Sequence, residues 1–173
     1  MKAEAVVAAA SNVASISTLK FDDSHDYGTY QSPTPYFSAF VNLTSLTFTI
    51  SSRFSSSNYR LIANMARLEK LNMRLCCSSE TSPTDADLEQ IVEACPLRSL
   101  KIKGFVNPMP LVWAALAAKG TLVNLELNFN KSWQQGGGGA HINPDGSKPL
   151  GSSLSAIIQI PSLKTICVTV STM

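Results

Sequence analysis

The 173-residue chain lacks any uninterrupted apolar run close to the roughly 20 residues that a transmembrane helix needs. We therefore expect no segment to span a membrane. Charged residues are also scarce, at 15%, and 14 basic residues nearly balance 12 acidic ones. A net charge of +2 indicates neither a nucleic-acid partner nor an anionic membrane. The hydrophobic content of 45% is too high for a mainly disordered chain and predicts a folded domain.

Only four cysteines are present, and two of them, Cys76 and Cys77, are adjacent, an arrangement that rarely forms a disulfide. A chain of this length and hydrophobicity needs no disulfide framework, so we predict reduced thiols and a cytoplasmic or nuclear location. Secretion is the alternative, because one lysine and small apolar residues at the start resemble a signal peptide, although Glu4 interrupts them. The sequons at Asn42 and Asn130 would matter only in that case.

One pattern recurs six times: an aliphatic residue, two others, a second aliphatic residue, one other, and a third apolar residue. The middle residues of the six units are Leu19, Leu46, Leu71, Leu100, Leu125 and Ile166. They are separated by 27, 25, 29, 25 and 41 residues. Four of these five steps fall within the roughly 20–29-residue period of leucine-rich repeats.

Each unit has the alternation of a half-buried strand. In the third unit Leu71 and Met73 point one way, whereas Lys70, Asn72 and Arg74 point the other way. Strands of a sheet covered on both faces would be continuous apolar runs instead. The sequence therefore predicts parallel strands with one buried face and one face open to water.

Helical segments are expected between the strands. They are predicted at 58–66, 85–94, 111–119 and 153–160, with a single turn at 33–40. Thr84 or Asp85 opens the second segment, and Cys95 with Pro96 ends it. Gly120 stands where the C-terminal cap of the third segment is expected. Units of strand and helix bury their apolar faces only when they stack on one another.

Residues 68–102 resemble the cysteine-containing leucine-rich repeat of many F-box proteins. The matching positions are Leu68, Leu71 and Met73 in the strand, Cys76 or Cys77, Thr84-Asp85, Leu88 and Ile91 in the helix, and Cys95-Pro96. The resemblance implies an α/β fold, a leucine-rich-repeat solenoid with a parallel sheet on the concave face and helices on the convex face. It also implies protein–protein interaction, with substrate recognition in an F-box-like ubiquitin ligase as one setting. No F-box sequence is found.

We expect a single domain over residues 1–173, made of about six degenerate repeats. A Gly-rich insertion at 131–151 accounts for the step of 41 residues. Two alternatives stay open at this point. One is an α/β enzyme whose catalytic loops are not recognised, and the other is an incomplete fragment of a longer repeat protein.

The open sheet face is the predicted binding site, because solenoids usually bind there. Its expected outward residues are Lys20, Asp22, Thr47, Thr49, Lys70, Asn72, Arg74, Ser99, Lys101, Lys103, Asn124, Glu126, Asn128, Thr165, Cys167 and Thr169. The partner-binding residues are predicted to be Lys70, Asn72, Arg74, Lys101, Lys103, Glu126 and Asn128. Four of these are cations on two neighbouring strands, so we expect a protein partner with an acidic segment. The alternative is a solvated face whose lysines discourage aggregation.

No catalytic residue, metal site or cofactor is predicted, and the chain is not expected to be an enzyme. The acidic run around His25 lacks the spacing of a calcium loop. The glycines before His141 are not followed by the Lys-Ser/Thr of a phosphate loop. No pair of cysteines has the CxxC spacing of a zinc site.

The last predicted strand contains the uncharged, β-prone segment 166–170. We expect Val168 to point into the core and Thr169 to point outward. A strand of this kind at the edge of a sheet favours pairing with another chain. Self-association through this strand is therefore a further expectation, and Lys164 is the only charge close to it.

Overall fold

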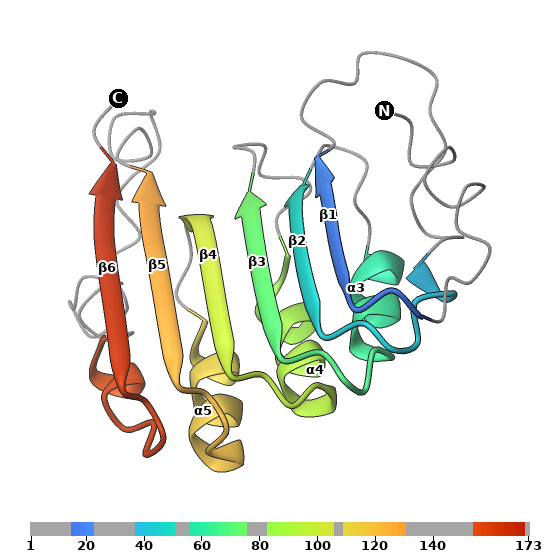
Figure 1. The fold of residues 1–173 in the computed structure, drawn as a ribbon. Coiled ribbons are helices and arrows are strands. Elements are labelled where there is room, and N and C mark those ends of the chain that lie inside the picture. The colour runs from blue at the N-terminus through green and yellow to red at the C-terminus, as the bar shows by residue number, and fades with distance from the viewer. Residues whose placement is uncertain are drawn as a thin grey trace.

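The computed structural model describes residues 15–22, 37–50, 56–75, 83–105, 109–130 and 154–171. Its strands are β1 (Thr18–Asp22), β2 (Ser45–Ile50), β3 (Lys70–Leu75), β4 (Ser99–Phe105), β5 (Asn124–Asn130) and β6 (Thr165–Ser171). They form one sheet in sequence order, and each strand is parallel to the next (Figure 1). The predicted α/β class and the order of the six strands are confirmed.

Helices α3 (Ser56–Ala63), α4 (Asp85–Ala94) and α5 (Pro110–Lys119) lie behind the sheet in the view of Figure 1. Thr84, one of the two residues predicted to open α4, is its N-cap: its hydroxyl oxygen accepts from the Asp87 N–H, and the Asp87 carboxylate accepts from the Thr84 N–H. Gly120 ends α5 in the left-handed conformation, also as predicted. The segment predicted at 58–66 is displaced, since α3 begins at Ser56 and ends at Ala63. Of the segment predicted at 153–160, the described part begins at 154, and 154–157 is helical.

The register of the sheet aligns the repeat positions. Leu19, Leu46, Leu71, Leu100, Leu125 and Ile166 follow one another directly across the six strands. On the four central strands these side chains are at most 2% exposed, because the helices cover this face. Burying a leucine in this way stabilises the fold by about 1.5–3 kcal/mol per side chain. The leucine pattern therefore marks the core.

The turns that lead into the strands repeat the same backbone geometry. At each turn, one backbone carbonyl accepts hydrogen bonds from the N–H groups of two consecutive residues that lead into the next strand. The residues with these carbonyls are Ser17, Thr44, Glu69, Arg98 and Val123. The last of them receives the N–H groups of Lys164 and Thr165. Entry into β6 therefore has the same geometry as entry into β2, although 41 residues separate the last two units.

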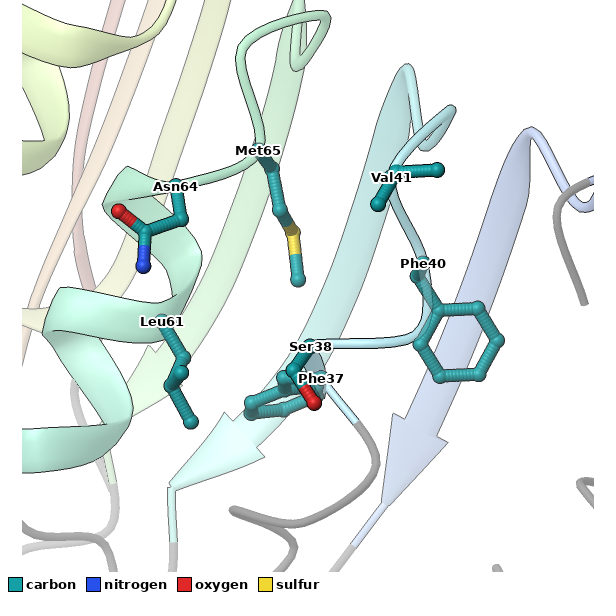
Figure 2. Close-up of a pocket in the computed structure, with 7 residues that line it drawn as sticks. All are labelled: Phe37, Ser38, Phe40, Val41, Leu61, Asn64 and Met65. Atoms are coloured by element: carbon teal, nitrogen blue, oxygen red, sulfur yellow. The ribbon is translucent and has the colours of Figure 1, made fainter.

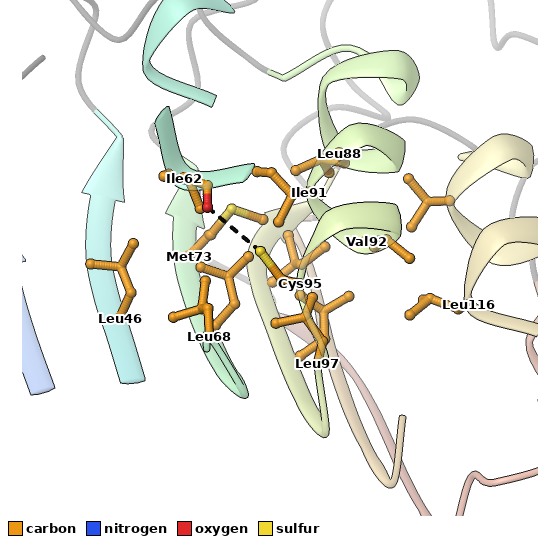
Figure 3. Packing of buried hydrophobic residues seen from close by; sticks show 14 of the residues in the cluster. Leu46, Ile62, Leu68, Met73, Leu88, Ile91, Val92, Cys95, Leu97 and Leu116 are labelled. Atoms are coloured by element: carbon orange, nitrogen blue, oxygen red, sulfur yellow. Dashed lines mark hydrogen bonds between the residues drawn. The ribbon is translucent and has the colours of Figure 1, made fainter. Parts of the chain in front are cut away.

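Cys95 connects neighbouring helices inside the core. Its side chain is fully buried, and its Sγ donates to the carbonyl oxygen of Ile62 at 3.5 Å (Figure 3). Ile62 lies in the last turn of α3, and its carbonyl oxygen also accepts from the Met65 N–H at 3.0 Å. A cysteine therefore suits this position because it packs as a small apolar group and also donates a hydrogen bond.

Two predictions about exposure are wrong, although register places both side chains on the expected face. Thr49, expected outward, is only 8% exposed, and its neighbour in register is the much longer Arg74. Val168, expected in the core, is 37% exposed, although it aligns with Leu127, which is fully buried. Val168 lies on the last strand of the sheet, and within the described residues no further strand packs beside it.

Several predictions lie outside the described residues. They concern the Gly-rich insertion at 131–151, most of the turn at 33–40, the adjacent cysteines Cys76 and Cys77, and the side chain of Asp22. Within the described ranges, none of the helices has both the length and the apolar character needed to cross a membrane.

Candidate functional site

The predicted binding residues lie on the sheet face opposite the helices, in three rows that run across the strands. The first row contains Lys70, Ser99 and Asn124; the second contains Asn72, Lys101 and Glu126; the third contains Arg74, Lys103 and Asn128. Each row places residues from β3, β4 and β5 directly beside one another. The structure therefore brings all seven predicted residues onto one face.

Lys101 and Glu126 are neighbours in the second row and form an ion pair. Their side chains are 28% and 37% exposed. A carboxylate beside Lys101 compensates its charge, which makes this lysine a poor anchor for an acidic partner. The predicted cluster of four cations is therefore reduced to three, a change that the sequence spacing alone does not reveal.

Arg74 and Lys103 are neighbours in the third row, and both side chains are exposed. Neighbouring strands are about 4.8 Å apart, and like charges placed opposite each other on such strands repel. No acidic side chain pairs with either residue within the part of the chain that the structure describes. Lys70 is exposed on the same face, at the start of β3. The third row is therefore the most cationic part of the face.

Gly104 lies in β4 immediately after the third row. It follows Lys103, has φ of 78°, and marks a shift in register between β4 and β5. A side chain at this position would overlap the carbonyl oxygen of Leu75 at the end of β3. Only glycine therefore allows β4 to approach β3 this closely immediately after the pair formed by Arg74 and Lys103.

A small hollow lies on the helix side of the molecule, away from the rows (Figure 2). Its volume is about 130 Å³, and it is lined by Phe37, Ser38, Phe40, Val41, Leu61, Asn64 and Met65. The sequence analysis did not identify it, because its walls come from two separate units. None of its lining side chains is ionisable, so it offers no acid–base or metal chemistry.

Two groups in the described core have shifted pKa values. Burial raises the pKa of the Cys95 thiol to about 11, although the nearby positive charge of Lys119 acts in the opposite direction. Burial, together with the negative charge of Asp87, raises the pKa of Tyr59. Both side chains stay protonated near neutral pH, so neither is an activated nucleophile or base.

The described residues contain no group of three or more His, Cys, Asp or Glu side chains that could hold a metal ion. The two histidines, His25 and His141, are outside the described ranges. The chain matches no family model, no curated protein and no solved structure. Its coarse class is thus defined by the fold itself: an α/β protein with a six-stranded parallel sheet and helices packed on one face.

Proposed function

We propose that the chain is a leucine-rich-repeat solenoid that binds a protein partner on its open sheet face. In this proposal the sheet forms the concave face and the helices form the convex face. The repeated turn geometry supports it, because the same pair of backbone hydrogen bonds recurs at all five junctions between strands. The exposure of Lys70 and Arg74 supports it too, since helices on both faces of the sheet would cover these side chains.

The pair formed by Arg74 and Lys103 is the observation that carries the choice of partner. Two exposed cations side by side repel, and a partner carboxylate between them would relieve that repulsion. Lys70 extends the positive charge along β3. Asn72 and Asn128 add amide groups that donate to and accept from a peptide backbone. We therefore propose an acidic protein segment as the ligand.

The resemblance of residues 68–102 to F-box repeats suggests one setting for this activity. In that setting the chain recognises the substrate of an F-box-like ubiquitin ligase. We also propose a cytoplasmic or nuclear location, which agrees with the free thiols of Cys95 and Cys167. That the chain is not an enzyme stays a prediction.

The proposal is tested by the binding of a labelled poly-glutamate peptide, followed by fluorescence anisotropy at low and high salt. Each exposed ion pair contributes up to about 1 kcal/mol, so Arg74→Glu with Lys103→Glu should weaken binding by about tenfold or more. Added salt should weaken binding to the wild-type chain in the same direction.

The matched control is Arg60→Glu with Arg67→Glu, which changes the net charge equally at exposed positions away from the three rows. This control should retain most of the binding. Equal losses in the two double variants would show that only net charge matters, and absence of binding by the wild-type chain would contradict the acidic ligand.

A further inference from the structure

β6 forms one end of the described sheet, and the side chains of Thr165–Thr169 are exposed on both faces. Ile166 and Val168 point toward the helix side, yet they are 43% and 37% exposed. Their neighbours in register, Leu125 and Leu127, are at most 1% exposed. The last strand therefore presents two large apolar side chains to water at positions that the preceding strands bury.

The side of β6 toward which each residue's N–H and C=O groups point follows from Thr165, its first residue. The N–H of Thr165 donates to the carbonyl of Val123 at 3.0 Å, so the backbone groups of Thr165 face β5. Directions alternate along a strand, so Cys167 and Thr169 also face β5. The N–H and C=O groups of Ile166 and Val168 consequently point away from β5, toward the open edge. The residues with exposed apolar side chains are thus those whose backbone groups can accept another strand.

We propose that a second copy of the chain pairs with this edge, with the two β6 strands antiparallel about a two-fold axis at Val168. A strand is the occupant that satisfies a row of edge N–H and C=O groups. A second copy fits because Ile166–Val170 carries no charge that would oppose an identical strand. A two-fold axis perpendicular to the sheet also keeps the helices of both copies on the same side.

This arrangement defines the contacts. Val168 lies opposite Val168 of the second copy in a hydrogen-bonded pair, where the exposed valines of the two edges meet. Cys167 lies opposite Thr169 of the second copy in a non-hydrogen-bonded pair, with Cα atoms about 4.5 Å apart. Centring on Val168 pairs all seven residues of β6. The seven residues of β6 in each copy are fewer than the roughly 20–30 residues per partner of a standard interface, so association in the micromolar range is expected.

Sedimentation velocity across the micromolar range gives the first test. The wild-type chain should show a monomer–dimer equilibrium, and Val168→Lys should weaken it by about tenfold or more because two like charges meet at the axis. The control is Val41→Lys, the same change at a valine that is 58% exposed near the other end of the sheet. A wild-type chain that is monomeric throughout, or a dimer unaffected by Val168→Lys, would overturn the proposal.

Disulfide trapping tests the register. Thr169→Cys places a thiol opposite Cys167 of the second copy, at a Cα separation that a disulfide can span. Mild oxidation should therefore yield a covalent dimer, which Cys167→Ser added to the same variant should abolish. Thr165→Cys is the control, because it faces Ser171 of the second copy and should yield little dimer. Equal trapping by both variants would refute this pairing, as would capture of a different protein in place of a second copy.

Discussion

Asp85 of α4 caps the start of the neighbouring helix α5, and Lys119 of α5 in turn caps the end of α4. The Asp85 carboxylate, at the start of α4, accepts from the N–H groups of Leu111 and Val112 at 2.9 and 3.1 Å, in the first turn of α5. Lys119 Nζ, at the end of α5, donates to three carbonyls at the end of α4, those of Val92, Glu93 and Cys95, at 2.6–2.9 Å. Each residue thus satisfies backbone groups that a helix end leaves without partners, and each charge opposes the local dipole.

Asp85→Ala should lower the free energy of unfolding by about 1–2 kcal/mol, because two N–H groups at the start of α5 lose their acceptor. Asp85→Asn should lose less, since one amide oxygen can still accept. Urea unfolding monitored by circular dichroism measures both variants. Glu89→Ala, in the middle of α4, is the control and should change stability little. Equal stability of Asp85→Ala and the wild-type chain would show that the cap contributes nothing.

Gly104→Ala should destabilise the chain more than Gly120→Ala. Both glycines have positive φ, which costs other residues about 1–2 kcal/mol. At Gly104 the new methyl group would also overlap the carbonyl oxygen of Leu75, whereas at Gly120 the nearest atom, Pro161 Cγ, is 3.8 Å away. Thermal unfolding of the two variants measures the difference. Equal losses would mean that backbone conformation alone decides the effect.

Lys101→Glu should be destabilising because it places two carboxylates side by side at Glu126. Adding Glu126→Lys restores opposite charges and should recover most of the loss. The pair is partly exposed, so a double-mutant cycle should give a coupling energy of about 0.2–1 kcal/mol that falls with added salt. A coupling of zero at low salt would indicate that the ion pair does not contribute to stability.

Alkaline pH should weaken the fold through Cys95. Its pKa rises from 9.0 to about 11 on folding, so the folded state holds the proton more tightly than the unfolded state. The resulting stability is fully present below about pH 9 and is lost as pH rises toward 11. Cys95→Val removes this titration, so its unfolding free energy should change less over that range. An identical pH dependence in both proteins would exclude Cys95 as the cause.

Thiol labelling at pH 8, with peptide mapping, provides an independent measure of the same burial. Cys95 is fully buried and should be protected in the folded chain, whereas Cys167 is exposed on the sheet face and should react. In urea both should react. Rapid labelling of Cys95 under native conditions would indicate that the core around α3 and α4 opens readily.

Local patterns were sufficient for the strands and for two of the helices. The alternation at Lys70–Leu75 identifies a strand with one apolar face because side-chain direction has a period of two. Thr84 and Gly120 mark helix ends because capping depends on a few neighbouring residues. The start of α3 has several adjacent residues that suit an N-cap, Ser55, Ser56, Ser57 and Asn58, so the sequence did not single one out and the predicted beginning was two residues late.

The features that distinguish the candidate site depend on how strands from different units meet. The pairing of Lys101 with Glu126 and the alignment of Arg74 beside Lys103 follow from register, which joins residues at least 25 positions apart. The low exposure of Thr49 and the high exposure of Val168 likewise depend on their neighbours. Sequence by itself determined which residues alternate, cap and repeat, because these properties are local. Only the tertiary structure decided which charges are compensated and which apolar side chains lack cover, because both depend on atoms from other units.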